Sequence, residues 1–126
     1  MIAGARYVHT NLIARDWRRL AAFYESVFGC VPLPPERDYS GPVFDAGTGV
    51  KGARLEDGPA PAVNRPGFSH IAFAVDSVED ARTECLAAGG TAVGDVVTLT
   101  TMAGSKVTWC YLADPEGNIV ELQRWD

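Results

Sequence analysis

Hydrophobic and polar positions change period several times along this chain, and each period predicts one kind of element. Between Asp16 and Gly29, apolar residues recur at intervals of three and four, which is the spacing of one helical face. These positions are Trp17, Leu20, Ala21, Tyr24, Val27 and Phe28. Asp16 is a residue type that caps helix N-termini and Gly29 one that ends helices, so the pattern predicts a helix between them.

The remainder of the first half predicts short strands. Residues 7–13 are rich in β-formers and predict a strand that precedes the helix. Residues 31–35 predict a second strand, although their prolines favour an edge or a loop. Residues 43–46 and 53–56 are further short candidates, and residues 57–66 contain three prolines and predict a linker.

The second half predicts the same order of elements more clearly. Residues 68–75 predict a strand, Ser77 with Asp80 resembles a capping box that opens a helix, and Gly89-Gly90 ends it. Three more strands are predicted over residues 91–97, 107–112 and 119–125, the last two joined by the strong turn Asp114-Pro115-Glu116-Gly117-Asn118.

Alternation of side chains assigns faces to the last two strands. Val120 and Leu122 predict a core face, which leaves Glu121 on the other side of the strand. Trp109 and Tyr111 share a face and either pack structurally, the commoner role for paired strand aromatics, or line a binding cup.

The two halves repeat one unit at an offset of about sixty residues. Each unit reads strand–helix–strand–strand–strand, which predicts a single α+β domain over residues 1–126. Module one covers about 5–58, a linker about 59–66, and module two about 67–126. The chain has only two histidines, His9 and His70, and they occupy matching strands. Together with Glu121 they predict a site for a divalent ion such as Zn, Fe, Ni, Mn or Co. The alternative is that each histidine is structural and Glu121 is solvated.

Composition excludes several classes of partner. The formal charge is −5 and Lys and Arg do not cluster, so neither nucleic acid nor an anionic membrane is an expected partner. No apolar run approaches the roughly 18 residues of a membrane span, and the N-terminus lacks the pattern of a signal peptide. Three cysteines without a CxxC spacing predict reduced thiols and a cytoplasmic location.

Two segments carry a resemblance to a known family. Gly-Phe-Ser-His-Ile-Ala-Phe-Ala-Val-Asp at 67–76 and Asp-Pro-Glu-Gly-Asn-Ile-Val-Glu-Leu at 114–122, within the repeat, resemble the vicinal oxygen chelate superfamily of glyoxalases, bleomycin resistance proteins and extradiol dioxygenases. The resemblance implies two modules that form a cupped mixed sheet around a divalent metal. Its ligands come from the first and last strands of each module, which matches His9, His70 and Glu121, with Glu56 the nearest candidate for the fourth.

The chain departs from that pattern in module one. His70 and Glu121 are 51 residues apart, and the same interval from His9 ends at Ala60, inside the linker. Module one is therefore expected to be shortened. A shortened module leaves an open sheet edge, and members of the superfamily often dimerise, so a homodimer is expected.

The resemblance also implies a reaction class. A metal-dependent lyase or isomerase would bind two adjacent oxygens of a small substrate, with Glu121 as a ligand and Glu56 as a ligand or base. One alternative is an extradiol-type dioxygenase, in which His9, His70 and Glu121 hold Fe(II). The other is a drug-binding protein that works without metal.

Overall fold

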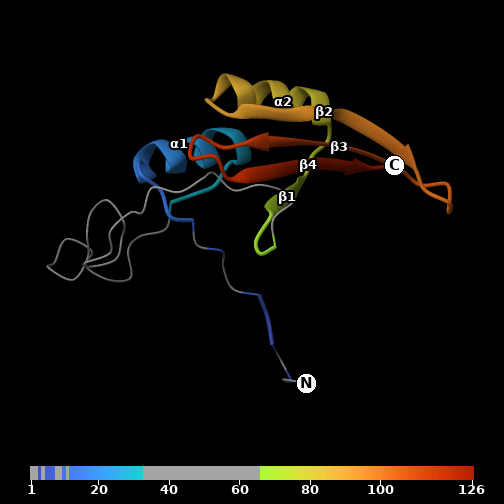
Figure 1. The fold of residues 1–126 in the computed structure, drawn as a ribbon, viewed down its shortest axis with the longest axis horizontal. Helices are drawn as coiled ribbons and strands as arrows, with labels where there is room; N and C mark the ends of the chain where they lie inside the picture. Colours follow the sequence, from blue (N-terminus) through green and yellow to red (C-terminus); the bar gives the residue numbers. More distant parts are fainter. Residues whose placement is uncertain (1–2, 4, 8–9, 11, 33–65) are drawn as a thin grey trace, which may run out of the picture.

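The fold is built around one mixed sheet with helices against one of its faces. The computed structural model describes residues 3, 5–7, 10, 12–32 and 66–126. Its elements are α1 (Trp17–Phe28), β1 (His70–Ala74), α2 (Val78–Ala87), β2 (Thr91–Thr100), β3 (Lys106–Ala113) and β4 (Ile119–Trp125). The strand order is β1-β4-β3-β2, with β1 parallel to β4 and the other neighbours antiparallel (Figure 1). The predicted α+β class is confirmed, and module two has its predicted strand–helix–strand–strand–strand order.

The helix α2 packs against one face of the sheet, over β2, β3 and β4. Its N-terminus is capped by Ser77, whose hydroxyl accepts a hydrogen bond from the Asp80 N–H at 3.2 Å. After the helix the chain turns sharply at Gly90, where a Cβ would lie 2.8 Å from the carbonyl oxygen of Cys85. That close approach explains the glycine, and it lets β2 begin directly beneath the helix.

The core lies between this face of the sheet and the two helices. Val120 and Leu122 of β4 are fully buried there, as the alternation predicts. The other fully or almost fully buried members of the cluster come from α1, α2 and β3: Phe23, Val78, Cys85, Cys110 and Leu112. The opposite face of the sheet carries none of them and is called the open face below.

The helix α1 begins and ends where the sequence predicts. The Asp16 side chain accepts a hydrogen bond from the Arg19 N–H at 3.0 Å, and Gly29 adopts the left-handed conformation with φ 64°. The predicted apolar face needs a correction at Trp17, which is 46% exposed, and at Phe23, which is buried although it was not predicted. Trp17 is the first residue of the helix and lies beyond the core. Phe23 completes the three-and-four spacing between Leu20 and Val27 and adds to the predicted face, of which Tyr24, Val27 and Phe28 also pack against the core.

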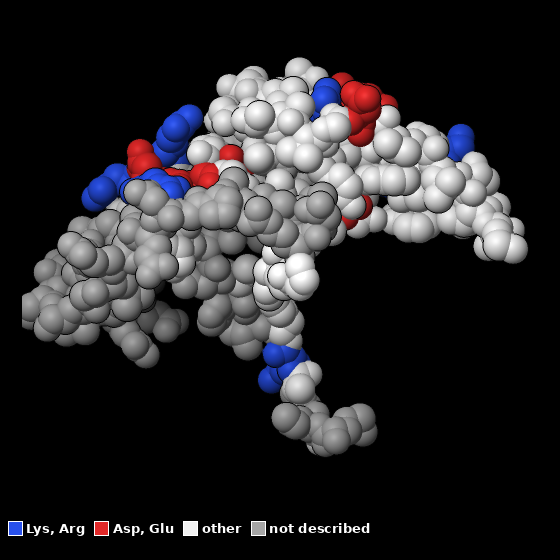
Figure 2. All heavy atoms as spheres, viewed as in Figure 1, with Lys and Arg blue, Asp and Glu red and all other residues white. Residues whose placement is uncertain are grey.

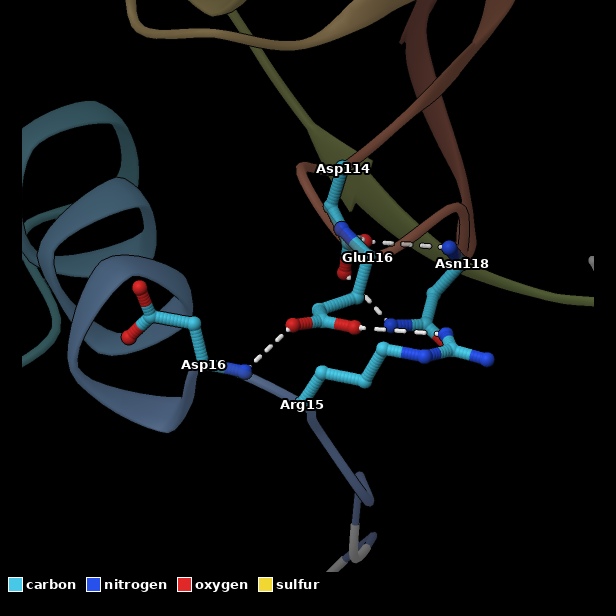
Figure 3. A network of polar contacts seen from close by, with 5 residues as sticks. All are labelled: Arg15, Asp16, Asp114, Glu116 and Asn118. Atoms are coloured by element: carbon cyan, nitrogen blue, oxygen red, sulfur yellow. Dashed lines mark hydrogen bonds and ion pairs between the residues drawn. The ribbon is translucent and has the colours of Figure 1, made fainter. Parts of the chain in front are cut away.

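The turn between β3 and β4 fastens α1 to the sheet (Figure 3). Glu116 accepts a hydrogen bond from the Asp16 N–H at 2.7 Å, at the N-terminus of α1. Asp114 is 3% exposed, and its carboxylate accepts four hydrogen bonds: from the Glu116 N–H, from the N–H and side-chain amide of Asn118, and from the Tyr24 hydroxyl. Burial and the charge of Asp114 raise the pKa of Tyr24 far above its usual value. Asp114 is therefore a structural anchor, because its oxygens are already occupied.

The strands predicted in module one are not observed among the described residues. Tyr7, Thr10, Leu12 and Ile13, which are the described part of the predicted strand over residues 7–13, lie outside any strand. Val31 and Pro32 are likewise not in a strand, and residues 33–35, 43–46 and 53–56 lie outside the described residues. Strands form by pairing, and among the described residues β1 is an edge strand with a neighbour on one side only. No helix in the described part of the chain has the length and apolar character needed to cross a membrane.

Candidate functional site

The open face of the sheet brings together two of the predicted site residues. His70 is the first residue of β1, and Glu121 lies in β4, the parallel neighbour of β1. Because Val120 and Leu122 point into the core, Glu121 projects from the open face. The Nε2 atom of His70 lies 2.8 Å from an Oε atom of Glu121, and the two side chains are 29% and 14% exposed. This pair is partly shielded from water yet reachable from it.

Two neighbours fix the orientation of the His70 ring. The Ser69 hydroxyl lies 3.0 Å from Nδ1, and the ring of Tyr111 packs edge-on at a centroid distance of 5.2 Å. With Nε2 donating to Glu121, Nδ1 accepts the hydroxyl proton of Ser69. A hydroxyl also accepts hydrogen bonds, so Ser69 can hold the tautomer in which Nδ1 carries the proton and the Nε2 lone pair is free. Ser69 is thus suited to orient His70 both as an ion-pair partner and as a ligand.

Tyr111 is the third side chain at this place on the open face. It lies directly opposite Glu121 in the β3–β4 register. Burial and the charge of Glu121 raise the pKa of the Tyr111 phenol, so the hydroxyl stays protonated at ordinary pH. Trp109, two residues away, shares its face and lies opposite Gln123. Both aromatic rings are therefore on the side away from the buried cluster, which favours the lining role over structural packing.

The geometry of the pair fits a shared metal ion. Nitrogen and oxygen ligands each lie about 2.0–2.2 Å from a zinc-like ion, so two of them in tetrahedral geometry are about 3.4 Å apart. The separation of 2.8 Å between Nε2 and Oε in the structure is shorter than that value. Imidazole and carboxylate also form a donor set that suits Zn, Fe, Ni, Mn and Co. A small opening of the pair is all that its two donor atoms need to converge on one ion.

The other predicted ligands are not placed by the structure. His9 and Glu56 lie outside the described residues. Within the described residues, no group of three or more His, Cys, Asp or Glu side chains is arranged to hold a metal. Sequence reasoning found His70 and Glu121 but gave no role to Ser69, for which adjacency to His70 was the only available signal.

Comparisons with known proteins agree with this architecture. A family described as "Glyoxalase-like domain" matches residues 8–122. A solved glyoxalase/bleomycin resistance protein from Albidiferax ferrireducens is 24% identical over 88% of this chain and 92% of its own, with a TM-score of 0.55. A glyoxalase/bleomycin resistance protein/dioxygenase family enzyme from Burkholderia phytofirmans is 21% identical over 91% and 94%, with a TM-score of 0.57. A glyoxalase family protein from Bacillus cereus is 16% identical over 99% of both chains, with a TM-score of 0.63. No curated protein matches the chain. At these identities the solved structures support the fold alone.

Proposed function

The chain belongs to the glyoxalase-like domain family, and on that premise we propose that it is a metal-dependent lyase or isomerase. Its substrate is a small molecule with two adjacent oxygens. The observation that carries the proposal is the convergence of His70 Nε2 and Glu121 Oε2, 2.8 Å apart on the open face. Within the described residues, neither side chain belongs to the buried hydrophobic cluster.

Each residue of the proposed site has a distinct role. His9, His70 and Glu121 hold one divalent ion, and Glu56 is a fourth ligand or the base. When bound, the ion supplies a Lewis acid that stabilises negative charge on adjacent substrate oxygens. Ser69 holds the His70 ring so that Nε2 faces Glu121, and Tyr111 packs against the edge of that ring. These contacts set the direction of the nitrogen lone pair before any ligand arrives.

The proposed chemistry is proton transfer next to a carbonyl. The Glu56 carboxylate takes a proton from the substrate carbon beside the carbonyl, and the electron pair of the C–H bond moves toward the carbonyl oxygen. In an isomerase the same carboxyl group returns the proton to the neighbouring carbon. A carboxylate suits this step because it can both accept and return one proton within hydrogen-bond reach.

Solvent exchange tests this chemistry without knowledge of the natural substrate. Protein supplied with Zn²⁺ is expected to catalyse exchange of hydroxyacetone C–H protons for deuterium, followed by proton NMR in D₂O. Glu56→Gln removes the exchange, while Glu84→Gln, which changes an exposed carboxylate on α2, leaves it unchanged. Exchange that is equal in wild-type protein and Glu56→Gln would overturn the assignment of the base.

A binding protein that works without metal is the second candidate. It is favoured by one observation: His70 and Glu121 already satisfy each other as an ion pair, beside the aromatic rings of Trp109 and Tyr111. Metal analysis of protein purified without added metal separates this candidate from the enzyme. Iron rather than zinc in that analysis would instead favour the dioxygenase alternative.

We also propose that the protein is a cytoplasmic homodimer. Within the described residues β1 pairs on one side only, and the three cysteines are free thiols, two of them buried. Light scattering at micromolar concentration is expected to give twice the chain mass of 13.5 kDa. A mass equal to that of one chain would contradict the dimer.

A further inference from the structure

The apolar and polar faces of the sheet change sides along the β2–β3 hairpin. Near the helices the core-side residues of β3 and β4 are apolar. Beyond them, the same side carries Thr98 and Thr108, whose hydroxyls are 2.9 Å apart, together with Lys106 and Arg124. The open face there is apolar instead. Figure 1 shows that this end of the hairpin extends past both helices. Apolar residues on one strand face ordinarily require a cover, and here they face away from the helices.

The apolar residues of the open face form a continuous strip. Leu99, Val107 and Trp125 lie side by side across β2, β3 and β4, and Val97 and Trp109 form the adjoining row with Gln123. We call these five apolar residues, Val97, Leu99, Val107, Trp109 and Trp125, the apolar strip. Figure 2 shows charged atoms gathered mainly over the helices, with few over the hairpin in that view.

The apolar strip leads directly to the His70–Glu121 pair. The row that follows Trp109 and Gln123 contains Tyr111 and Glu121, so the rows succeed one another along β3 and β4. No charged side chain stands on this face of β3 or β4 between Glu121 and Trp125. Trp125 is four positions beyond Glu121 along the strand, which corresponds to about 13 Å. A molecule with its polar end at Glu121 would therefore lie along the strip.

The indole N–H of the exposed Trp125 already has a hydrogen-bond partner. Trp125 is 59% exposed, yet its Nε1–H donates to the Gln123 side-chain oxygen at 2.7 Å. The ring is held in place and presents apolar surface, which is how aromatic side chains line small-molecule sites. The same hydrogen bond engages the side-chain oxygen of Gln123, the residue between Trp125 and Glu121 on this face.

The exposed area of the strip fits a small molecule better than a second protein chain. Val107, in the middle of the strip, is only 9% exposed. The accessible surface of the strip therefore comes mainly from Val97, Leu99 and Trp125, which are 44%, 55% and 59% exposed. Together they present on the order of 300 Å², below the roughly 800 Å² that each partner contributes to a stable protein interface.

We infer that the substrate carries an apolar substituent, an aromatic ring or an alkyl chain, which binds the apolar strip while its adjacent oxygens face His70 and Glu121. This inference rests on the proposed function and names the substrate class of the same site. It predicts that affinity rises with the apolar part of a chelating ligand. It also places the specificity of the enzyme on β2, β3 and the end of β4, rather than on the proposed metal ligands.

A matched pair of probes tests the inference by calorimetry. Acetohydroxamate and octanohydroxamate present the same two adjacent oxygens and differ in alkyl chain length. Protein supplied with Zn²⁺ is expected to bind octanohydroxamate at least about tenfold more tightly, because each buried methylene adds favourable transfer free energy. Val97→Asp, in the row next to Tyr111 and Glu121, reduces this preference to below about threefold and leaves acetohydroxamate affinity unchanged. Thr100→Asp, which adds the same charge on the opposite face of β2, keeps the preference.

The outcomes separate the inference from the proposed function. Zn²⁺-dependent binding of both probes with equal affinity would overturn the inference and leave the metal site intact. Failure of both probes to bind in the presence of Zn²⁺ would overturn both. If Val97→Asp left the preference unchanged and instead lowered the mass measured by light scattering, the strip would be a contact between copies of this chain, and the inference would be wrong.

Discussion

Replacement of Asp114 by alanine tests how the β3–β4 turn holds α1 to the sheet. The carboxylate accepts hydrogen bonds of 2.9 Å from the Tyr24 hydroxyl, 2.9 Å from the Glu116 N–H, and 3.0 and 2.8 Å from Asn118. Hydrogen bonds to a charged group each contribute about 1.5–3 kcal/mol, but the freed backbone N–H groups recover part of this through water. We therefore expect Asp114→Ala to lower the free energy of unfolding by about 3–5 kcal/mol, as when one partner is removed from a buried charged network.

Urea unfolding followed by far-ultraviolet circular dichroism and tryptophan fluorescence measures this loss. Two further variants each remove part of the hydrogen-bond network around Asp114. Tyr24→Phe removes one donor and should cost about 1–2 kcal/mol. Asp114→Asn keeps the volume but sets a new amide N–H₂ against that of Asn118, so its cost should lie between the other two. A loss below about 1 kcal/mol for Asp114→Ala would refute the reasoning, because the four hydrogen bonds would then contribute little to the fold.

Three further predictions address the core, the backbone and the alkaline limit of stability. Leu20→Ala should cost about 2–5 kcal/mol in the same unfolding assay, since Leu20 is 6% exposed; a cost below 1 kcal/mol would show that α1 is not packed as described. Gly90→Ala should cost about 1–3 kcal/mol, because the new Cβ would overlap with the Cys85 carbonyl. Gly29→Ala should cost less, because a Cβ there meets nothing and only the left-handed backbone is penalised. The reverse order would contradict the tight turn at Gly90. Burial raises the pKa of Cys85 to about 11 from 9.0, so its contribution to stability is complete below pH 9 and is lost as the pH rises through 11. Unfolding free energies measured from pH 8 to 11 should fall in wild-type protein and fall less in Cys85→Ala, and parallel curves would count against this assignment.

The sequence predicted the elements of module two because alternation and caps are local signals. Val120, Leu122 and Glu121 were assigned to their faces by period two alone. The sequence predicts that β2 ends at Val97, three residues before its observed end at Thr100. Thr98 and Thr100 interrupt the apolar pattern, because they lie on the core side of the sheet but beyond the part that the helices cover. Phe23 is not predicted because the expected face runs from Leu20 to Tyr24, an interval of four. The interval of three from Leu20 to Phe23 is equally regular in a helix.

Contacts between segments that are far apart in the sequence cannot be predicted from local patterns. The hydrogen bond between Asp16 and Glu116 joins residues one hundred positions apart, and no periodicity indicates it. The position of Tyr111 opposite Glu121 depends on the register between β3 and β4, which local patterns do not fix. The repeat predicted His70 and Glu121 as one site, and the structure brings them together. His9 and Glu56 remain predictions.

Zinc titration calorimetry of the wild-type protein and two variants tests the central claim, that His70 and Glu121 hold one divalent ion together. The account predicts one site per chain in wild-type protein, lost in His70→Ala and in Glu121→Ala. Both variants should keep the wild-type circular dichroism spectrum, because these side chains lie outside the buried hydrophobic cluster. Unchanged zinc affinity in both variants, or no zinc binding by the wild-type protein, would contradict the account.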